Sequence, residues 1–509
     1  MTNAPNAWIS GPEVEDLDVL IVGAGISGVA GAYYLRRDCK DIRFTILENE
    51  DSFGGTWWTH RYPGIRSDSD LHTFGYSFKP WVGPPIATAE EIRKYMGEVI
   101  EENELAPYIR YRHRVTSAEW SSADGHWRIT AECNETGETK RFTANFLWMC
   151  QGYYRHNEGH MPDWEGTETF KGTLVHTEEW PEDLDYTDKR VVVIGSGATA
   201  ATVVPAMAGK AQHVTMLQRS PTYFRLGRNA IELVEELRNL QVDEAWIHEI
   251  TRRKMMYEQS AFTQMCFDKP EAVKDMLIGE VRKVLGPDFD VDTHFTPSYR
   301  PWRQRIAFVP DADLFQAIAR GEASVVTDHI ERFVENGIQL RSGKVLEADI
   351  VAAATGFNMD ITGSISLRKD GQPLQFKDTV TYRGMMFTGV PNLAWVFGYF
   401  RASWTLRSEL VAEFVCRMVE HLKETGAVSV EPQLRPSERD MALAPWFDDE
   451  NFNPDYLTRV MDQLPKRGAT REWQHTQDHW RERDEFPAID LDDDVFVYRW
   501  NERSSEAAD

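Results

Sequence analysis

A glycine-rich turn near the start of this 509-residue chain has the residue types and spacing that bind a dinucleotide. It follows a predicted strand, Asp18–Val22, and opens a predicted helix. Gly23 permits the tight turn, Gly25 lets the backbone approach a pyrophosphate, and Gly28 lets the helix pack on the strand. Glu48 stands 20 residues after the third glycine and can accept hydrogen bonds from ribose hydroxyls. This first unit predicts a dinucleotide with free ribose hydroxyls.

A second turn of the same kind begins 172 residues later and differs in one residue that bears on specificity. It follows a predicted strand, Arg190–Ile194, and runs through Gly195 and Gly197 to Ala200, the alanine variant of the third glycine. Arg219 occupies the position that is acidic in the first unit. An arginine there binds a 2′-phosphate through charge-assisted hydrogen bonds, whereas a carboxylate repels it, so this unit predicts NADPH. The further residues expected to contact the cofactor are Ala198, Thr199 and Ser220.

Composition excludes several other classes of protein. Lysine and arginine number 56 against 81 aspartates and glutamates, and the net charge of −25 argues against a nucleic-acid partner. The five cysteines form no CxxC pair, so we expect no metal site and no disulfide reductase of similar two-unit architecture. No basic leader precedes the first apolar run, which is too short and too rich in glycine to span a membrane. We therefore expect a cytoplasmic enzyme that holds FAD and NADPH face to face.

Between the two turns lies a segment of the form FxGxxxHxxxWP, whose fixed positions are Phe170, Gly172, His176, Trp180 and Pro181. It resembles the fingerprint of the type I Baeyer–Villiger monooxygenases, flavoenzymes that convert ketones into esters or lactones. The related flavin-containing monooxygenases end the same motif with a different residue. The resemblance implies that His176 is a hinge or linker residue rather than a chemical base.

Other motifs extend this resemblance over roughly residues 16–480. Gly55, Thr56 and Trp57 belong to a GGTW segment similar to the one with which the family contacts its flavin. Residues 61–68 form an RYPGxRxD segment similar to the one near the flavin ring. Together these motifs most resemble the ethionamide-activating monooxygenases, a bacterial subgroup of the family.

The family resemblance also implies a reaction and the residues that assist it. Reduced FAD reacts with O2 to give a flavin 4a-peroxide, whose anion attacks a ketone carbonyl before one carbon migrates to oxygen. The family's active-site arginine follows a helical insertion, where Arg305 is the match and Arg303 the competitor. Asp68 matches the carboxylate that pairs with this arginine. Gln304 replaces a lysine that many members use to hold NADPH, so Arg219 must carry more of the selectivity for NADPH over NADH.

The sequence says less about the substrate. Aromatic residues between Pro391 and Leu406, with Trp302 and Tyr223, are predicted either to line a large apolar pocket or to belong to the core. The family's range implies O2 and a small-molecule ketone or thioether, with sulfoxidation as a second reaction. The alternative is a flavin-containing monooxygenase that acts mainly on sulfur or nitrogen nucleophiles. A third interpretation is a flavoprotein that senses the NADPH/NADP⁺ ratio.

The predicted fold class is α/β: two dinucleotide-binding (Rossmann-like) domains, with the NADP domain inserted in a split FAD domain, plus a helical insertion. Residues 231–281 are charged and amphipathic, and are broken only at Lys269-Pro270, which predicts several helices there. The expected parts are 1–152 (FAD domain, first part), 153–225 (NADP domain, first part), 226–300 (helical insertion), 301–350 (NADP domain, second part), and 351–509 (FAD domain, second part, and C-terminal tail).

Overall fold

The first glycine turn follows the central strand of a mixed sheet, in a computed structural model that describes residues 14–500. Strand β1 (Val14–Val22) pairs in parallel with β2 (Phe44–Leu47) on one side and β6 (Thr139–Met149) on the other. It begins four residues before the predicted strand because Val14–Leu17 also pair with β6. The other strands of this sheet are β3 (Ile109–Arg110), β4 (His113–Ser121), β5 (His126–Cys133), β19 (Ser366–Lys369), β20 (Gln372–Pro373) and β23 (Leu393–Trp395).

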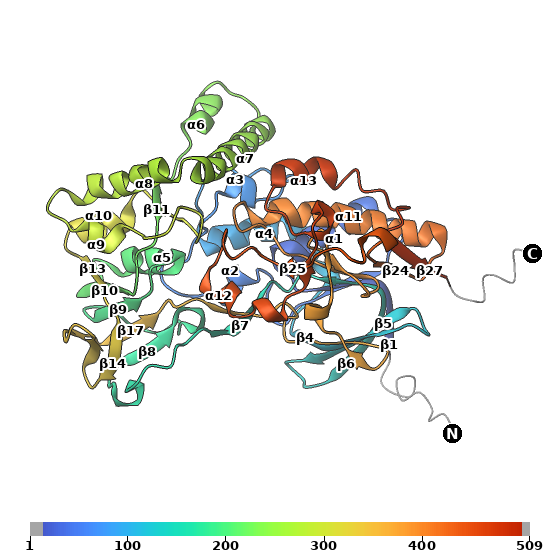
Figure 1. Ribbon diagram of the computed structural model, residues 1–509, viewed down its shortest axis with the longest axis horizontal. Helices are drawn as coiled ribbons and strands as arrows, with labels where there is room; N and C mark the ends of the chain where they lie inside the picture. The colour runs from blue at the N-terminus through green and yellow to red at the C-terminus, as the bar shows by residue number, and fades with distance from the viewer. Residues whose placement is uncertain (1–13, 501–509) are drawn as a thin grey trace, which may run out of the picture.

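Helix α1 (Ile26–Asp38) leaves this turn and packs against α11 (Trp404–Thr425), which lies almost four hundred residues further along the chain. Ser27 of α1 hydrogen-bonds Ser408 of α11 at 2.8 Å, and Gly31 sits directly against the indole ring of Trp148 on the sheet. The first unit is therefore assembled from both ends of the described chain, as Figure 1 shows on its right-hand side.

The second glycine turn belongs to a separate sheet in which all five strands are parallel. Their order is β13-β10-β9-β17-β8, and β9 (Arg190–Ile194) has the predicted bounds. The remaining strands are β8 (Thr173–His176), β10 (His213–Gln218), β13 (Ala323–Thr327) and β17 (Ile350–Ala353). Helix α5 (Ala198–Met207) follows the turn and packs on α10 (Asp313–Ala319). The two-unit α/β architecture is thus the predicted one.

The chain crosses between the two units on a short antiparallel pair of strands. It leaves the first unit along β7 (Tyr154–Gly159) and returns along β18 (Phe357–Met359). Figure 1 shows β7 between the two sheets. The first crossing lies just after the predicted boundary at residue 152, whereas the return lies beyond the predicted boundary at residue 351, because β17 still belongs to the second sheet.

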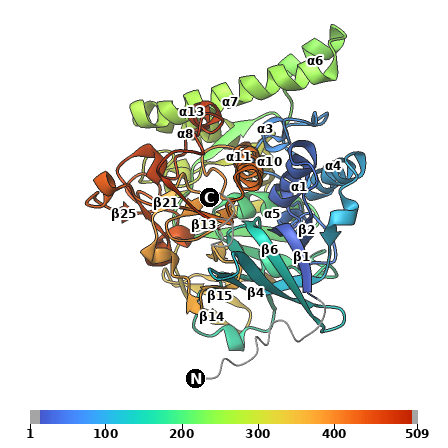
Figure 2. The same ribbon diagram turned by 90° about the vertical axis from the view of Figure 1, so that its right-hand side faces the viewer.

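A helical layer covers one side of both units. It consists of α6 (Glu232–Asn239), α7 (Glu244–Asp268), α8 (Pro270–Leu285) and α9 (Val291–Phe295). The break between the two long helices falls at Lys269, as the sequence predicts, since Pro270 is the first residue of α8. Figure 2 shows α7 lying across the top of the molecule.

A buried ion pair ties this helical layer to the first unit. Arg252 of α7 donates to Glu409 of α11 at 2.8 Å and to the backbone oxygen of Gly75 at 2.8 Å, just after α3 (Leu71–Phe74). Both side chains are less than a tenth exposed. Because breaking a buried pair leaves an uncompensated charge, this contact holds α7 firmly over the first unit.

The remaining elements are short, apart from α4, and complete the surface of the two units. None of the helices in the described part of the chain combines the length and apolar character needed to cross a membrane. These elements are α2 (Thr56–Thr59), α4 (Ala89–Glu102), α12 (Asp455–Thr458), α13 (His479–Glu485), β11 (Phe224–Gly227), β12 (Ala307–Pro310), β14 (Ile330–Val334), β15 (Gly337–Leu340), β16 (Val345–Glu347), β21 (Thr381–Tyr382), β22 (Met386–Phe387), β24 (Ser429–Pro432), β25 (Ala444–Pro445), β26 (Lys466–Arg467) and β27 (Phe496–Arg499).

Candidate active site between the two dinucleotide units

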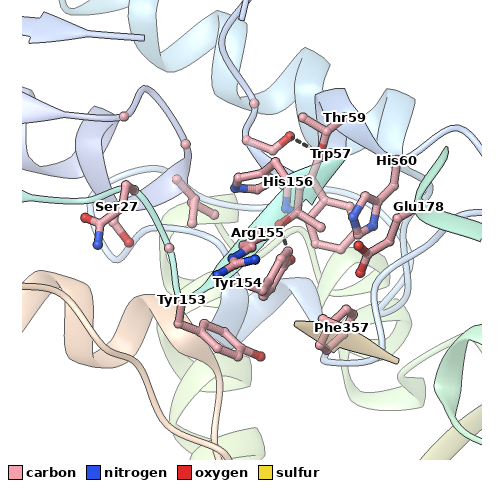
Figure 3. A pocket seen from close by; sticks show the side chains of 18 of the residues that line it. Ser27, Trp57, Thr59, His60, Tyr153, Tyr154, Arg155, His156, Glu178 and Phe357 are labelled. Atoms are coloured by element: carbon pink, nitrogen blue, oxygen red, sulfur yellow. Dashed lines mark hydrogen bonds between the residues drawn. The ribbon is translucent and has the colours of Figure 1, made fainter. Parts of the chain in front are cut away.

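A cavity of about 530 Å³ lies between the two units, and segments from both of them line it. The first unit contributes its glycine turn, α2 and the loop that carries Asp68. The second contributes the start of α5 and the loop after β8, while β7 of the connector lies between them. Figure 3 shows the side chains that point into this space. Ligands of parallel α/β sheets bind at the carboxyl ends of the strands, which is where this cavity lies.

The first glycine turn forms an open backbone cradle at one end of the cavity. Gly23 has a φ of 95°, a conformation that favours glycine, and a Cβ there would lie 2.9 Å from the backbone oxygen of Cys150. A Cβ on Gly25 would face the Cα of Gly55 across the cradle at 3.7 Å. Gly28 packs its backbone on the turn as predicted, since a Cβ would overlap the oxygen of Gly23. These backbone surfaces fit a pyrophosphate that approaches the helix N-terminus.

Glu48 stands beside this cradle with its carboxylate already oriented. It accepts hydrogen bonds from the backbone N–H of Ala24 at 2.6 Å and of Glu50 at 2.9 Å. Burial raises the pKa of Glu48 in spite of these donors. The side chain lines the cavity, where it can receive ribose hydroxyls.

Thr56 and Trp57 extend the lining along α2. The Thr56 hydroxyl hydrogen-bonds the Tyr154 hydroxyl of β7 at 2.5 Å, and Trp57 packs edge-on against Phe74. Burial and the neighbouring Tyr153 raise the pKa of Tyr154 well above its usual value, so the phenol stays protonated. The GGTW segment is therefore fixed to the connector on one side and to the first unit on the other.

The second glycine turn reaches the cavity through only some of its predicted residues. Gly195 has a φ of 139°, and a Cβ there would lie 2.3 Å from the oxygen of Ala354. A Cβ on Gly197 would meet no atom within 4 Å, so this side of the turn is open to a ligand. Ala198 and Thr199 line the cavity. A pyrophosphate fits between the open turn and the N-terminus of α5.

Arg219 and Ser220 lie farther out, at the end of β10. The Arg219 side chain is 68% exposed and forms an ion pair with Asp455 of α12 at 3.3 Å. The backbone oxygen of Ser220 accepts a hydrogen bond from the Ser196 hydroxyl of the glycine turn. An exposed pair of this kind is weak, so a phosphate can replace Asp455 as the partner of Arg219.

Arg305 and Asp68 meet in the cavity from opposite units. The Arg305 Nε lies 2.9 Å from Asp68 Oδ2, and its Nη2 lies 3.0 Å from Oδ1, which gives a two-point contact. Burial lowers the pKa of Arg305, but Asp68 and the neighbouring tyrosines together outweigh burial, so the pKa of the guanidinium lies above its usual value. Arg303 is exposed and lies outside the cavity lining, as does the half-buried Gln304.

The five fingerprint residues divide into packing residues and one cavity residue. Phe170 packs on Phe333. Gly172 leaves space for the phenyl ring of Phe170, since a Cβ on Gly172 would lie 2.4 Å from that ring. Trp180 is buried in the core and is followed by the exposed Pro181. Only His176 lines the cavity.

His176 contacts the connector that joins the units. A Cβ on Gly159 of β7 would overlap the imidazole ring, and the His176 Nδ1 accepts the backbone N–H of Glu178 at 3.2 Å. Burial lowers the pKa of His176 to about 4, so the ring is neutral near pH 7. This position suits the predicted hinge role better than proton transfer.

Glu178 is a cavity residue that sequence analysis missed. Its side chain is buried, and neither carboxyl oxygen has a hydrogen-bond partner among the described residues. Burial, with the charge of Glu179, raises its pKa to about 8. Figure 3 shows the carboxyl group directed into the space near His60 and Phe357. The sequence carries no signal for this, because two successive glutamates in a loop are typical of a solvated surface.

The predicted aromatic segment divides between cavity and core. Tyr399, Phe400 and Trp404 line the cavity, whereas Trp395 and Phe397 are buried against Trp446. Trp302 and Tyr223 are likewise buried core residues outside the cavity lining. Both of the alternatives considered for this segment therefore hold for part of it.

Comparison with known proteins gives the chain clear relatives. A family model described as flavin-binding monooxygenase-like matches residues 17–230. The FAD-containing monooxygenase EthA of Mycolicibacterium smegmatis is 44% identical over 468 residues, which cover 92% of this chain and 94% of that protein. The probable FAD-binding monooxygenase AlmA of an Acinetobacter species is 41% identical over 486 residues, covering 95% and 96%.

Solved structures share the fold at lower identity. An oxidized steroid monooxygenase bound to NADP matches with a TM-score of 0.74 and 24% identity, over 96% of this chain and all of that one. A cyclohexanone-bound cyclohexanone monooxygenase matches with a TM-score of 0.75 and 19% identity over the same shares. These likenesses confirm the predicted architecture of two dinucleotide-binding domains.

The unpartnered carboxyl of Glu178 predicts a pH-dependent cost to stability. An ordinary glutamate ionises near pH 4.5, so between there and about pH 8 the unfolded chain has lost a proton that the folded chain keeps. Stability therefore falls as pH rises through this window, and Glu178→Gln removes the loss. We expect Glu178→Gln to have a higher free energy of unfolding than the unaltered protein. This advantage should increase with pH above pH 5 and reach about 3 kcal/mol at pH 8.

Urea unfolding of the FAD-loaded, NADP-free protein at the two pH values measures this advantage. Glu168→Gln is the matched control, because that carboxylate is exposed, lies outside the cavity and should change stability little at either pH. An advantage of Glu178→Gln that is the same at both pH values would contradict a raised pKa.

Proposed function

Because the chain belongs to the family of FAD-containing monooxygenases, with FAD and NADP(H) as its cofactors, we propose that it inserts one oxygen atom from O2 next to a ketone carbonyl. The products are an ester or lactone and water, and NADPH supplies the two electrons. The observation that carries this proposal is the two-point contact between Arg305 and Asp68 inside the cavity. Oxygen transfer to thioethers at the same site is the second reaction.

The Arg305 guanidinium provides a fixed positive charge where the reaction develops a negative one. Bound FAD supplies the oxygen-activating chemistry, and bound NADPH supplies the hydride. Ketone oxygenation passes through an oxyanion, and a cation that is already held in place stabilises that charge without reorganising solvent. Asp68 keeps the guanidinium oriented through both of its oxygens, so the charge stays at one place in the cavity.

The two glycine turns and the residues beside them bind and orient the cofactors. The turn at Gly23 and Gly25 holds the FAD pyrophosphate, and Glu48 holds the ribose of its adenosine half. The open turn at Gly197 holds the NADPH pyrophosphate, and Arg219 exchanges Asp455 for the 2′-phosphate. Gln304 adds no positive charge to this phosphate site.

Aromatic side chains give the reacting end of the cavity an apolar wall. Tyr153 stacks on Trp404, and Phe400 closes the same side. Such a wall excludes water and accepts the carbon skeleton of a ketone. The substrate class that fits is an apolar ketone whose carbonyl points toward Arg305.

Replacing Arg305 tests the proposed reaction. Arg305→Ala should lower kcat for ketone oxygenation by about 10²- to 10³-fold, the usual effect of removing one oxyanion-stabilising group. Arg303→Ala is the matched control, since that arginine is exposed and lies outside the cavity. Ester formation and NADPH consumption are measured together for a ketone and for a thioether.

The two substrates separate the proposed function from its alternative. Oxygen transfer to a ketone needs an anionic oxygenating species, whose charge Arg305 stabilises. Oxygen transfer to a thioether needs only the protonated form of that same species. A protein that oxidises thioethers but no ketone, with or without Arg305, would be a flavin-containing monooxygenase of the sulfur- and nitrogen-oxidising kind. Conversion of neither would favour the sensor interpretation.

Replacing Arg219 tests the cofactor assignment. Arg219→Ala should raise KM for NADPH by about 10- to 100-fold through loss of a charge-assisted contact, with KM for NADH unchanged. Asp455→Asn, which frees the guanidinium, should leave KM for NADPH equal or lower. Equal losses for NADPH and NADH in Arg219→Ala would contradict the assignment.

A further inference from the structure

Two neighbouring arginines near the active site lack a carboxylate partner. The guanidinium groups of Arg300 and Arg401 lie over the ring of Phe267, at 4.3 and 4.8 Å from its centre. Both donate to the backbone oxygen of Asn451, at 3.1 and 2.9 Å. Within residues 14–500, no aspartate or glutamate oxygen comes within 4.0 Å of either group.

It is unusual that two adjacent like charges lack a close carboxylate in so acidic a chain. Burial, followed by the charge of Arg300, lowers the pKa of Arg401 to about 10, and the Arg401 Nε is buried without a hydrogen-bond partner. Asp448 opposes this effect from a longer distance, and Arg303 adds to the positive charge at Arg300. The chain has 81 acidic residues, yet none of those described pairs closely with these two guanidinium groups. The pair of arginines can therefore bind an anionic ligand.

Arg401 lines a second cavity that adjoins the active site. This cavity measures about 690 Å³ and lies between α7 and the C-terminal segment. Phe400 and Ala402, the two chain neighbours of Arg401, line both cavities. The backbone N–H of Phe400 donates to Gln477 at 2.7 Å, which fixes this shared wall.

The rest of the second cavity is amphipathic. Its apolar lining consists of Met256, Phe267, Leu406, Trp446, Phe447 and Phe452. The other charged groups are mostly neutralised: Arg471 pairs with Glu485, and Arg481 with Asp478. Arg467 donates to a backbone oxygen, and Asp448 hydrogen-bonds Asn451. The cavity thus offers an apolar surface that ends at the guanidinium of Arg401.

We propose that this second cavity binds a carboxylate at the far end of the substrate through Arg401, which lines it, assisted by the charge of Arg300, which lies beside Arg401 just outside the lining. The inference rests on the proposed function and narrows its substrates to apolar ketones, or thioethers, that carry a remote carboxylate. The carbonyl would lie at Arg305 while the chain passes Phe400 and Ala402. The keto acid, O2, NADPH and a proton then give an ester acid, NADP⁺ and water, and the carboxylate takes no part in the bond changes.

Binding of dodecanoate tests the site without any turnover. Isothermal titration of the FAD-loaded protein should show dodecanoate binding at least about 10-fold more tightly than dodecanol, which lacks the charge. Arg401→Gln and Arg300→Gln should each weaken dodecanoate by about 10- to 100-fold, and the lysine variants should restore part of the loss. Arg225→Gln is the control and should bind like the unaltered protein, because Arg225 lies over Phe262 of the same helix and shares neither Phe267 nor Asn451 with Arg401.

Turnover then links the site to the reaction. The two substrates compared are a straight-chain methyl ketone and the methyl-keto acid of equal length. Arg401→Gln should lower kcat/KM for the acid, relative to kcat/KM for the ketone, by the factor by which it weakens dodecanoate binding. The loss should lie in KM rather than in kcat. Equal binding of dodecanoate and dodecanol, or binding that ignores Arg401 and Arg300, would overturn the inference. Arginine-dependent binding of dodecanoate without oxidation of either ketone would leave the anion site standing and overturn the proposed function instead.

Discussion

The contact between Arg305 and Asp68 is the constraint on which the rest of the structure depends. Asp68 belongs to the first unit, and Arg305 follows the helical layer that is inserted in the second. Nearly 240 residues separate them in sequence, yet both nitrogens of the guanidinium edge meet both carboxylate oxygens. Such a contact needs the two units closed over each other, because each unit carries only one of the two partners.

Several other contacts can be understood as means of keeping the two units in that arrangement. The helical layer crosses from the second unit to the first, where Arg252 and Glu409 anchor it. The connector of β7 and β18 is short, and His176 packs against Gly159 in it. The exposed pair between Arg219 and Asp455 adds a weaker contact that a cofactor phosphate can break. Strong contacts thus frame the site, and weaker ones lie where ligands must enter.

Local patterns in the sequence predicted the parts of the fold that local chemistry determines. The strand Arg190–Ile194 and the break at Lys269-Pro270 come from short-range rules and match the structure. The placement of Asp68 and Arg305 came from a family resemblance, since no spacing rule relates residues so far apart. Their contact in the structure agrees with that placement, while their chemical roles stay predictions.

Residues whose character depends on tertiary burial could not be predicted. Glu178 is an ordinary loop glutamate until β7 of the connector packs against its segment and its side chain is buried. Arg300 and Arg401 become neighbours only because both stack on Phe267, which α7 brings to them. Aromatic residues of one segment divided between cavity and core for the same reason. In each case the sequence gives the residue type, and the environment decides its use.

The most direct test of the account is product analysis after turnover of a ketone under isotopically heavy O2 in ordinary water. We expect an ester with one heavy oxygen inserted beside the carbonyl carbon, one product formed for each NADPH consumed, and loss of this product in Arg305→Ala. Consumption of NADPH that yields only hydrogen peroxide, with every ketone recovered unchanged, would contradict the role given to the Arg305 and Asp68 pair.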